Sequence, residues 1–353
     1  MIKSFLTMKR SFSLIISFAV AALLLVACNS DDNLPVDKTE VGKIDKSKYT
    51  TLTTVNDGMT RSHYIINHTL NNGADVWWQP GDKLWLYILD NLRIGSVTSN
   101  LTTGSPTAEF YFTYDFDQPQ YKVNYLGNQN STDGYFVTFG EYQWQYPPNN
   151  TDHLQNVGDC AEGTATRIVQ GQYTVRMHRL PAYLCIMPYC SDPDLRTGAI
   201  LKSVTITADN ALRGKFDVGR YGLFDRTHAQ GLGNNINMVL NGGNGFSVDN
   251  ATEDQNRNAI FTVMLPGWHV LTLTFDFTSP KIPGQTLRAV KTLNNIDYHP
   301  NTMTDIVADV ANYYNADNNL IGDGGTIAFS KKQTGVTVRT HKNWETLFNK
   351  ESK

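Results

Sequence analysis

Side chains able to catalyse a reaction or hold a metal are few in this sequence, and their spacing matches none of the common motifs. The chain has no GxSxG elbow for a serine nucleophile, no HExxH pair for zinc, no CxxC pair and no phosphate-binding loop. His63 and His68 are five residues apart, which places them on opposite faces of a strand. Paired metal ligands must share a face, so we interpret both as isolated histidines. We therefore predict no enzyme activity, no cofactor and no metal site.

The cysteines are too few for a disulfide scaffold. Of the four cysteines, Cys28 belongs to an N-terminal motif described below, which leaves Cys160, Cys185 and Cys190. An oxidising compartment permits one disulfide among these three, and the sequence does not say which. Cys185 lies between Leu184 and Ile186, so we expect it to be a small buried hydrophobic residue.

Aromatic side chains offer the main alternative to a purely structural protein. Trp77, Trp78, Trp85 and the Tyr142 to Tyr146 stretch contain flat faces that could stack on sugar rings. Packing in a hydrophobic core accounts for the same residues more simply. Trp77, Trp78 and Trp144 coplanar on the surface would favour glycan binding, whereas buried tryptophans would favour a structural role.

The elements that position these side chains begin with an export signal. Lys3, Lys9 and Arg10 precede an apolar run from Ser11 to Ala27, which has the form of a signal peptide over residues 1–27. Residues 28–48 are polar, charged and without periodicity, as expected of a tether. The remaining residues have to form the folded part of the protein.

Hydrophobic periodicity of two dominates after the tether. From Val270 to Phe277 apolar and polar residues alternate, and a similar alternation runs from Ala108 to Phe116. Pro80 and Gly81 fit the central positions of a type II turn, so we predict a hairpin between Val76–Trp78 and Lys83–Leu89. Further strands are expected at Tyr173–Met177, Ala182–Met187, Leu201–Ala208, Ile236–Leu240 and Phe261–Leu265. Thr302–Asn312 fits the helix and strand periods equally well, and we favour a strand.

Composition and length limit the class of protein. The 353 residues are 41% hydrophobic, which is enough for two ordinary domains. The net charge of −3 provides no basic field for a phosphate backbone, so nucleic-acid binding is not expected. A polar, proline-containing stretch from Ser191 to Asp194 separates two apolar-patterned blocks. We therefore predict an all-β fold with two β-sandwich domains, residues 49–195 and 196–353.

The N-terminal motif resembles that of bacterial lipoproteins. Leu25-Val26-Ala27-Cys28 is similar to a lipobox, in which the cysteine is acylated, with chains such as palmitate, and becomes the first residue of the mature protein. Ser30-Asp31-Asp32 resembles the acidic signal that sends lipoproteins of the Bacteroidota to the outer face of the outer membrane. The resemblance implies that Cys28 is a lipid anchor.

The motifs that follow resemble those of the fimbrillin family of Bacteroidota, the type V pilins and their Mfa-like relatives. They are, in order, Thr60-Arg61-Ser62, Trp77 to Leu84, Ala108-Glu109-Phe110, His178 to Leu184, Val204-Thr205-Ile206, Leu212 to Phe216 and Val263 to Gly267. Together they cover most of the mature chain. The resemblance implies two tandem transthyretin-like β-sandwich domains and a lipoprotein precursor that assembles into surface fimbriae.

Assembly in that family implies strand exchange between subunits, a form of β-augmentation. Cleavage after an arginine removes an N-terminal strand, and a donor strand of another subunit takes its place. Here Arg61 and Ser62 are the candidate cleavage point, and Tyr49–Val55 is the strand that would be lost. Trp344, Thr346 and Phe348 alternate near the C-terminus as a candidate donor strand, although this segment could instead be the last strand of its own domain.

The sequence thus predicts a non-enzymatic, surface-exposed lipoprotein of the outer membrane that serves as a stalk, tip or anchor subunit of fimbriae. Its expected partners are other fimbrial subunits, by donor-strand exchange, and the outer membrane, through the lipid. The alternative is a surface glycan-binding lipoprotein that uses exposed aromatic residues. A host or glycan ligand is not identified by the sequence.

Overall fold

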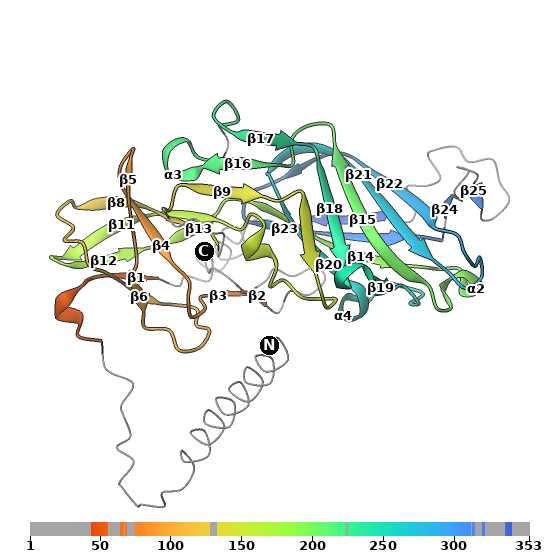
Figure 1. Cartoon of the computed structure of the whole chain (residues 1–353), viewed down its shortest axis with the longest axis horizontal. Coiled ribbons are helices and arrows are strands. Elements are labelled where there is room, and N and C mark those ends of the chain that lie inside the picture. The colour runs from red at the N-terminus through yellow and green to blue at the C-terminus, as the bar shows by residue number, and fades with distance from the viewer. Residues whose placement is uncertain are drawn as a thin grey trace, which may run out of the picture. The chain divides into compact units, whose positions relative to one another are not determined.

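A computed structural model describes residues 44–55, 64–66, 68, 75–127, 133–223, 225–311, 313–314, 320–321 and 336–340. The chain divides into two compact units, residues 1–44 and 45–353, and the fold below is that of the second unit. Strands dominate it, which confirms the predicted all-β class (Figure 1). The helices among the described residues are single turns: α2 (Pro193–Arg196), α3 (Val218–Tyr221), α4 (Gln255–Asn258), and the 3₁₀ turns η1 (Lys46–Lys48), η2 (Leu154–Asn156) and η3 (Asn241–Gly243).

The first sheet has nine strands among the described residues. In spatial order they are β5 (Leu92–Gly95), β4 (Leu84–Leu89), β8 (Gln120–Tyr125), β11 (Ala161–Val169), β12 (Gln172–Val175), β1 (Thr50–Thr54), β7 (Glu109–Phe112) and β6 (Thr98–Ser99), with β13 (Met177–Arg179) also paired to β11. The first strand of the unit, β1, therefore lies inside this sheet and not at its edge.

The strands of the first sheet pack around a single hydrophobic core. Trp78 is fully buried and meets Phe110 of β7 and Tyr125 of β8 edge to face, with ring centroids 5.0 and 5.7 Å apart. Edge-to-face contacts of this kind are favourable beyond the area they bury. Leu52 and Leu86 contribute to the same core. Because strands far apart in the spatial order share it, the sheet must curl over itself.

A second and a third sheet pack face to face as a sandwich (Figure 1). The second contains β10 (Tyr142–Gln145), β18 (Asn235–Leu240), β15 (Ile200–Ala208), β21 (Gly267–Thr278), β22 (Leu287–Tyr298), β24 (Tyr313–Tyr314) and β25 (Leu320–Ile321), with β19 (Phe246–Ser247) paired to β15. The third contains β20 (Ile260–Met264), β14 (Ala182–Tyr189), β23 (Thr302–Asp309) and β26 (Val336–Thr340). The alternation predicted for Val270–Phe277 is confirmed, since Leu271, Leu273, Phe275 and Phe277 are all buried in this sandwich.

Two smaller sheets complete the described fold. One contains β17 (Gln230–Gly233), β16 (Arg213–Asp217) and β9 (Phe136–Phe139), and the other pairs β2 (Tyr64–Ile66) with β3 (Asp75–Trp77). Phe139 of β9 and Phe216 of β16 belong to a separate hydrophobic core, which covers the face of the third sheet that is turned away from the second sheet. The third sheet is thus buried on both faces.

The turn at Gln79–Asp82 forms as predicted, but the hairpin around it does not. The Asp82 N–H donates to the Gln79 carbonyl over 3.1 Å, and Gly81 has the positive φ of 94° that a type II turn requires. The strands on either side do not pair with each other, because β3 pairs with β2 and β4 pairs with β5 and β8. The hairpin prediction was therefore wrong, although the local turn geometry was right.

Strand pairing does not follow the predicted domain boundary at residue 195. Strand β14 lies before that boundary in sequence, yet it pairs with β20 and β23, which lie after it. Similarly, β9 pairs with β16, and β10 pairs with β18. Whether residues 49–195 and 196–353 fold as separate domains of the transthyretin type stays a prediction.

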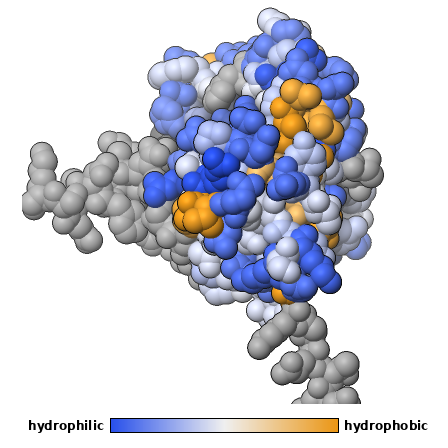
Figure 2. Space-filling model, turned by 90° about the vertical axis from the view of Figure 1, so that its left-hand side faces the viewer, coloured by the Kyte–Doolittle hydropathy of each residue, from blue (hydrophilic) through white to orange (hydrophobic). Residues whose placement is uncertain are grey.

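The surface shown in Figure 2 is mainly hydrophilic, with apolar residues gathered in separate patches. Among the described residues, exposed apolar side chains include several at hairpin ends: Leu89 and Leu92 at the β4–β5 turn, and Ile168 and Val169 at the β11–β12 turn. Scattered exposed apolar residues are normal for a folded protein and require no partner.

Candidate functional site

The strand most relevant to assembly is β1, which fills a slot between two other strands of the first sheet. We call the space between β7 and β12 the β1 slot. Leu52 lies opposite Phe110 in the antiparallel pair with β7 and opposite Tyr173 in the parallel pair with β12. Its side chain is only 1% exposed. The backbone of β1 is thus hydrogen-bonded on both sides, as in any interior strand.

Hydrogen bonds of the backbone and of Thr54 hold β1 in the slot. The Thr54 hydroxyl accepts the Ala108 N–H over 2.8 Å and donates to the Ala108 carbonyl over 3.2 Å. Backbone bonds at the ends of the strand, such as Val55 N–H to the Val175 carbonyl at 3.0 Å, extend the ladder. Only Leu52 brings a large apolar side chain, so hydrogen bonds hold β1 more than hydrophobic burial does.

An ion pair next to β1 joins the 3₁₀ turn η1 to β7. Lys46 Nζ lies 2.6 Å from Glu109 Oε2. Burial alone would raise the pKa of Glu109, but hydrogen bonds from Lys46 and the Tyr111 hydroxyl lower it below its ordinary value. Because Lys46 is more than half exposed, this pair adds little to stability.

The predicted processing and anchoring residues cannot be placed. Cys28, Arg61 and Ser62 lie outside the described residues, as do Trp344, Thr346 and Phe348 of the candidate donor strand. Just before the latter, β26 pairs antiparallel with β23 of the third sheet. Within the described ranges no helix has the length and apolar character needed to cross a bilayer.

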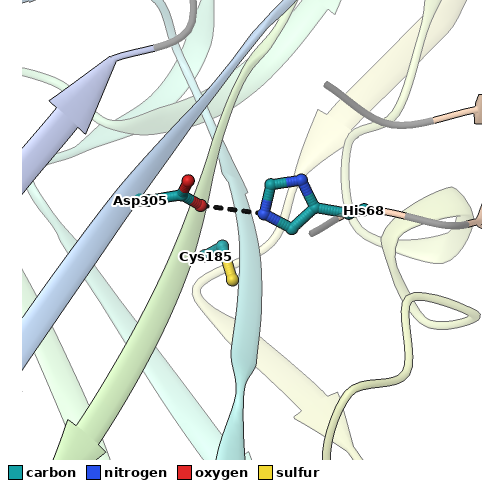
Figure 3. Close-up of side chains that lie close together, drawn as sticks. All are labelled: His68, Cys185 and Asp305. Atoms are coloured by element: carbon teal, nitrogen blue, oxygen red, sulfur yellow. Dashed lines mark hydrogen bonds and ion pairs between the residues drawn. The ribbon is translucent and has the colours of Figure 1, made fainter. Parts of the chain in front are cut away.

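A buried cluster of three polar side chains is the clearest concentration of chemical groups in the described part of the chain (Figure 3). It consists of His68, Cys185 and Asp305, whose potential ligand atoms all lie within 4.8 Å of one another. His68 Nε2 is 2.8 Å from Asp305 Oδ1. The side chains of His68 and Asp305 are 2% and 0% exposed, and Cys185 is completely buried. We call these three residues the His-Cys-Asp cluster.

The third sheet positions two members of this cluster. Cys185 of β14 and Asp305 of β23 are directly opposite in a parallel strand pair, so their side chains project from the same face. Burial raises the pKa of the Cys185 thiol well above its usual value, and the Asp305 carboxylate beside it adds to the effect. Cys185 is therefore a protonated thiol in this state of the protein, and not a nucleophile.

His68 reaches the cluster from the segment that follows β2. Its imidazole meets Phe261 edge to face at 5.9 Å, and its backbone carbonyl accepts a hydrogen bond from the Gln255 amide over 2.5 Å. These contacts hold the ring over the third sheet. The interpretation of His68 as an isolated histidine is thus wrong, because its partners come from strands remote in sequence. The interpretation of Cys185 as buried is confirmed.

The described cysteines form no disulfide. Cys160, Cys185 and Cys190 are all free and buried. Cys190 Sγ instead contacts the Asp192 carbonyl over 3.7 Å. The single disulfide that the sequence permits among these three is therefore not made in this structure.

The tryptophans divide between the two predicted roles. Trp78 is fully buried and Trp85 is nearly so, as core packing predicts. Trp144, by contrast, is 46% exposed and alternates with Tyr142 (56%) on the edge strand β10 and with Tyr146 (60%), the residue that follows this strand. We call these three the β10 aromatic row. Because Trp78 is buried, the predicted coplanar surface of Trp77, Trp78 and Trp144 does not form.

Two glutamines explain why the β10 aromatic row faces outward. Gln143 and Gln145 alternate with the aromatic residues and are buried. The Gln143 amide donates to the Val263 carbonyl over 2.8 Å and accepts the Val263 N–H over 3.1 Å, and Gln145 makes the same kind of contacts with Phe261 and Ala259. These side chains satisfy the free edge of β20, which otherwise has unpaired backbone groups. Their inward orientation fixes the outward orientation of the aromatic rings.

Comparisons with solved structures find matches of low similarity. A candidate cell adhesion protein from Bacteroides uniformis is 13% identical, with a TM-score of 0.44, covering 84% of this chain and 98% of that one. Another from Bacteroides ovatus is 11% identical, with a TM-score of 0.42, covering 83% and 96%. A fimbrilin from Porphyromonas gingivalis is 8% identical, with a TM-score of 0.36, covering 82% and 96%.

No family model and no curated protein matches the chain. Each of these three TM-scores is below 0.5, so the likenesses show nothing about the function of this chain.

Proposed function

We propose that this protein is a structural, non-enzymatic subunit of cell-surface fimbriae that assembles through strand exchange at the β1 slot. The observation that carries the proposal is the interior position of β1, the first strand of the folded unit, between β7 and β12. An N-terminal strand at this position can leave without any other strand changing its order. A strand from a second copy can then pair with the same two neighbours.

Removal of β1 would expose backbone groups that need new partners. The facing edges of β7 and β12 would lose their hydrogen bonds, and the apolar core around Phe110 and Tyr173 would become accessible. An open edge beside an apolar surface binds an extended strand well, because both the backbone groups and the apolar contacts are satisfied together. In an isolated subunit β1 therefore protects the slot.

The composition of β1 suits a strand that is meant to be exchanged. Its sequence, Thr50 to Thr54, contains a single large apolar side chain, Leu52. Full burial of one leucine contributes about 1.5–3 kcal/mol. A donor strand with alternating larger apolar residues gains more from the same slot, and the C-terminal alternation of Trp344 and Phe348 has that pattern.

Processing and anchoring complete the proposal. Cleavage after Arg61 would cut the connection between β1 and the rest of the unit, leaving Ser62 as the new first residue. Before cleavage, acylated Cys28 would hold the subunit on the outer face of the outer membrane, since several acyl chains give stable membrane binding. A subunit that is never cut would stay at the membrane as an anchor, whereas cut subunits would form a stalk or tip.

The proposal is tested by treating the folded full chain with an arginine-specific protease. We expect cleavage after Arg61 and release of the segment that contains β1, both detected by mass spectrometry. We also expect growth of oligomers, detected by light scattering. Arg61→Lys is the matched control, because it keeps the positive charge and removes the cleavage site. Oligomers that form equally in this variant, or a cut product that stays monomeric at high concentration, would reject strand exchange at this site.

Two additional measurements test whether the β1 slot is the site of assembly and which segment supplies the donor strand. A synthetic peptide with the sequence of Tyr49–Val55, added in excess, should block oligomer growth, whereas a scrambled peptide should not. Truncation after Thr340 removes Trp344, Thr346 and Phe348, so it should abolish assembly if these residues supply the donor strand. Assembly by the truncated chain would assign the donor to another segment.

Glycan binding is a second candidate function, favoured by the β10 aromatic row. Its rings are spaced by two residues along a strand, so neighbouring rings are about 7 Å apart. Such a row can stack on successive sugar rings. The test is quenching of tryptophan fluorescence by soluble oligosaccharides, with Trp144→Ala compared with Trp268→Ala, which removes an exposed tryptophan on β21. Quenching that is lost in Trp144→Ala but kept in Trp268→Ala would support glycan binding. No quenching in the unsubstituted protein would exclude it.

A further inference from the structure

We propose that His68, Cys185 and Asp305 are the protein ligands of a buried zinc ion. The three residues are the His-Cys-Asp cluster, whose potential ligand atoms lie within 4.8 Å of one another. They supply one imidazole nitrogen, one sulfur and one carboxylate, which are the donor types that zinc accepts in proteins. This inference is independent of strand exchange, because no residue of the cluster belongs to the β1 slot.

The third sheet presents two of the ligands in a fixed geometry. Cys185 and Asp305 are opposite each other in the parallel pair of β14 and β23, and both strands are buried along most of their length. Strand positions of this kind are better defined than positions on loops, and a metal site needs such definition. The sheet therefore provides a preformed pair of ligands.

The surroundings of this pair are compatible with a bound cation. Cys185 belongs to the apolar cluster that includes Met303 and Val307, the neighbours of Asp305 on the same face of β23. A carboxylate in such surroundings is costly unless a positive charge or hydrogen-bond donors compensate it. A divalent cation with three protein ligands would compensate Asp305 and would also stabilise Cys185 as the thiolate, which releases its proton to solvent on binding.

His68 approaches the pair from a separate segment and can act as the third ligand. Its Nε2 atom is 2.8 Å from Asp305 Oδ1. Oxygen and nitrogen ligands bound to zinc at about 2.0–2.2 Å in a tetrahedral arrangement are about 3.4 Å apart, so these two atoms would have to separate by about 0.6 Å. His68 lies outside any strand, so this movement needs no change of strand pairing.

The test measures zinc bound to the full chain carrying Cys28→Ser, so that no N-terminal thiol contributes. The protein is refolded with zinc, dialysed against metal-free buffer and analysed by elemental mass spectrometry. We expect one zinc per chain and a higher melting temperature than after refolding with a chelator. Calcium and magnesium, which prefer oxygen ligands, should give no such increase.

Single substitutions test whether zinc binds at the His-Cys-Asp cluster or at other groups of the protein. In this background, Cys185→Ser and Asp305→Asn should weaken zinc binding about 100-fold or more, since even loss of an indirect contact to a metal costs about 10–100-fold. Cys190→Ser is the matched control, because it removes a buried thiol outside the cluster and should leave binding unchanged. Equal binding by the Cys185→Ser protein would overturn the proposal.

A spectroscopic measurement keeps the proposal testable if the variants fail to fold. Cobalt should replace zinc in the unsubstituted cluster and give the intense near-ultraviolet absorption of a thiolate-to-cobalt charge transfer. Binding without this absorption, or less than a tenth of a metal ion per refolded chain, would overturn the assignment of Cys185 as a ligand.

Discussion

Arg179 of β13 and Asp159 form an ion pair in which the two side chains are only 4% and 2% exposed. The Tyr183 hydroxyl completes the group: it accepts from Arg179 Nη1 over 2.8 Å and donates to Asp159 Oδ1 over 2.5 Å. Arg179 and Tyr183 belong to strands of the first and third sheets, respectively. The ion pair therefore lies where the chain passes from one sheet to the other.

Replacement of Arg179 by methionine should destabilise the protein strongly. The variant leaves Asp159 buried without its cation, and removing one partner of a buried ion pair costs about 3–5 kcal/mol. Urea unfolding measures the loss. Arg288→Met is the control: it breaks the more exposed pair with Asp276 and should cost about 1 kcal/mol or less. Equal losses in the two variants would show that burial of the Arg179 pair has no special importance.

Gln143 should contribute to stability through the edge of β20. Gln143→Leu keeps a similar size but leaves the N–H and carbonyl of Val263 without the partners that the amide provides. Each buried group left unsatisfied costs about 1–3 kcal/mol, and the Val263 amide should exchange with deuterium faster. Gln230→Leu, at an exposed position of β17, should change the free energy of unfolding by no more than about 0.5 kcal/mol. Unchanged exchange at Val263 would contradict this role of Gln143.

Sequence periodicity predicted the strands well because it reports local exposure. Between residues 170 and 311 the strands predicted from alternation or apolar runs are present, including Thr302–Asp309, where helix and strand patterns fitted equally well. The alternation at Trp344, Thr346 and Phe348 lies outside the described residues and stays a prediction. Periodicity does not predict which strands pair, because strand pairing depends on contacts between segments that are far apart in the sequence. The turn at Pro80 and Gly81 was correct, yet the strands beside it pair elsewhere.

The His-Cys-Asp cluster could not be found from spacing, because His68 and Asp305 are 237 positions apart. One signal was available. Asp305 alternates with Met303 and Val307, so it occupies an apolar face of a strand, and a carboxylate there requires a compensating partner. The sequence gives no indication that this partner is His68, since only the folded chain brings the segment after β2 over the third sheet.

Leu52 should hold β1 in place more than any other side chain of that strand. Leu52→Ala removes apolar contacts between Phe110 and Tyr173 and should lower the free energy of unfolding by about 2–5 kcal/mol. After arginine-specific cleavage, the altered strand should also leave faster, which a fluorescent label on the released segment can follow. Leu92→Ala, on the exposed end of β5, should have little effect on either quantity. Release that is no faster from the Leu52→Ala chain would argue against a weakly held strand.

His153 should make the protein less stable as the pH falls below neutrality. Its ring is buried and lies 2.9 Å from the Phe261 carbonyl, and burial lowers its pKa from 6.5 to about 4. The unfolded chain therefore binds a proton near pH 6.5 and the folded chain only near pH 4. The contribution of His153 to the free energy of unfolding is fully present above pH 6.5. It is lost progressively between pH 6.5 and pH 4, by about 3 kcal/mol in total.

Comparison with His153→Gln isolates this contribution from the carboxylates that titrate in the same range. Urea unfolding of both proteins between pH 7 and pH 4 should give a steeper loss of stability for the unsubstituted chain, because glutamine stays neutral throughout. Below about pH 4 the difference should stop growing, since folded and unfolded chains are then both protonated at His153. Parallel stability curves over the whole range would mean that His153 is solvated enough to titrate normally in the folded protein.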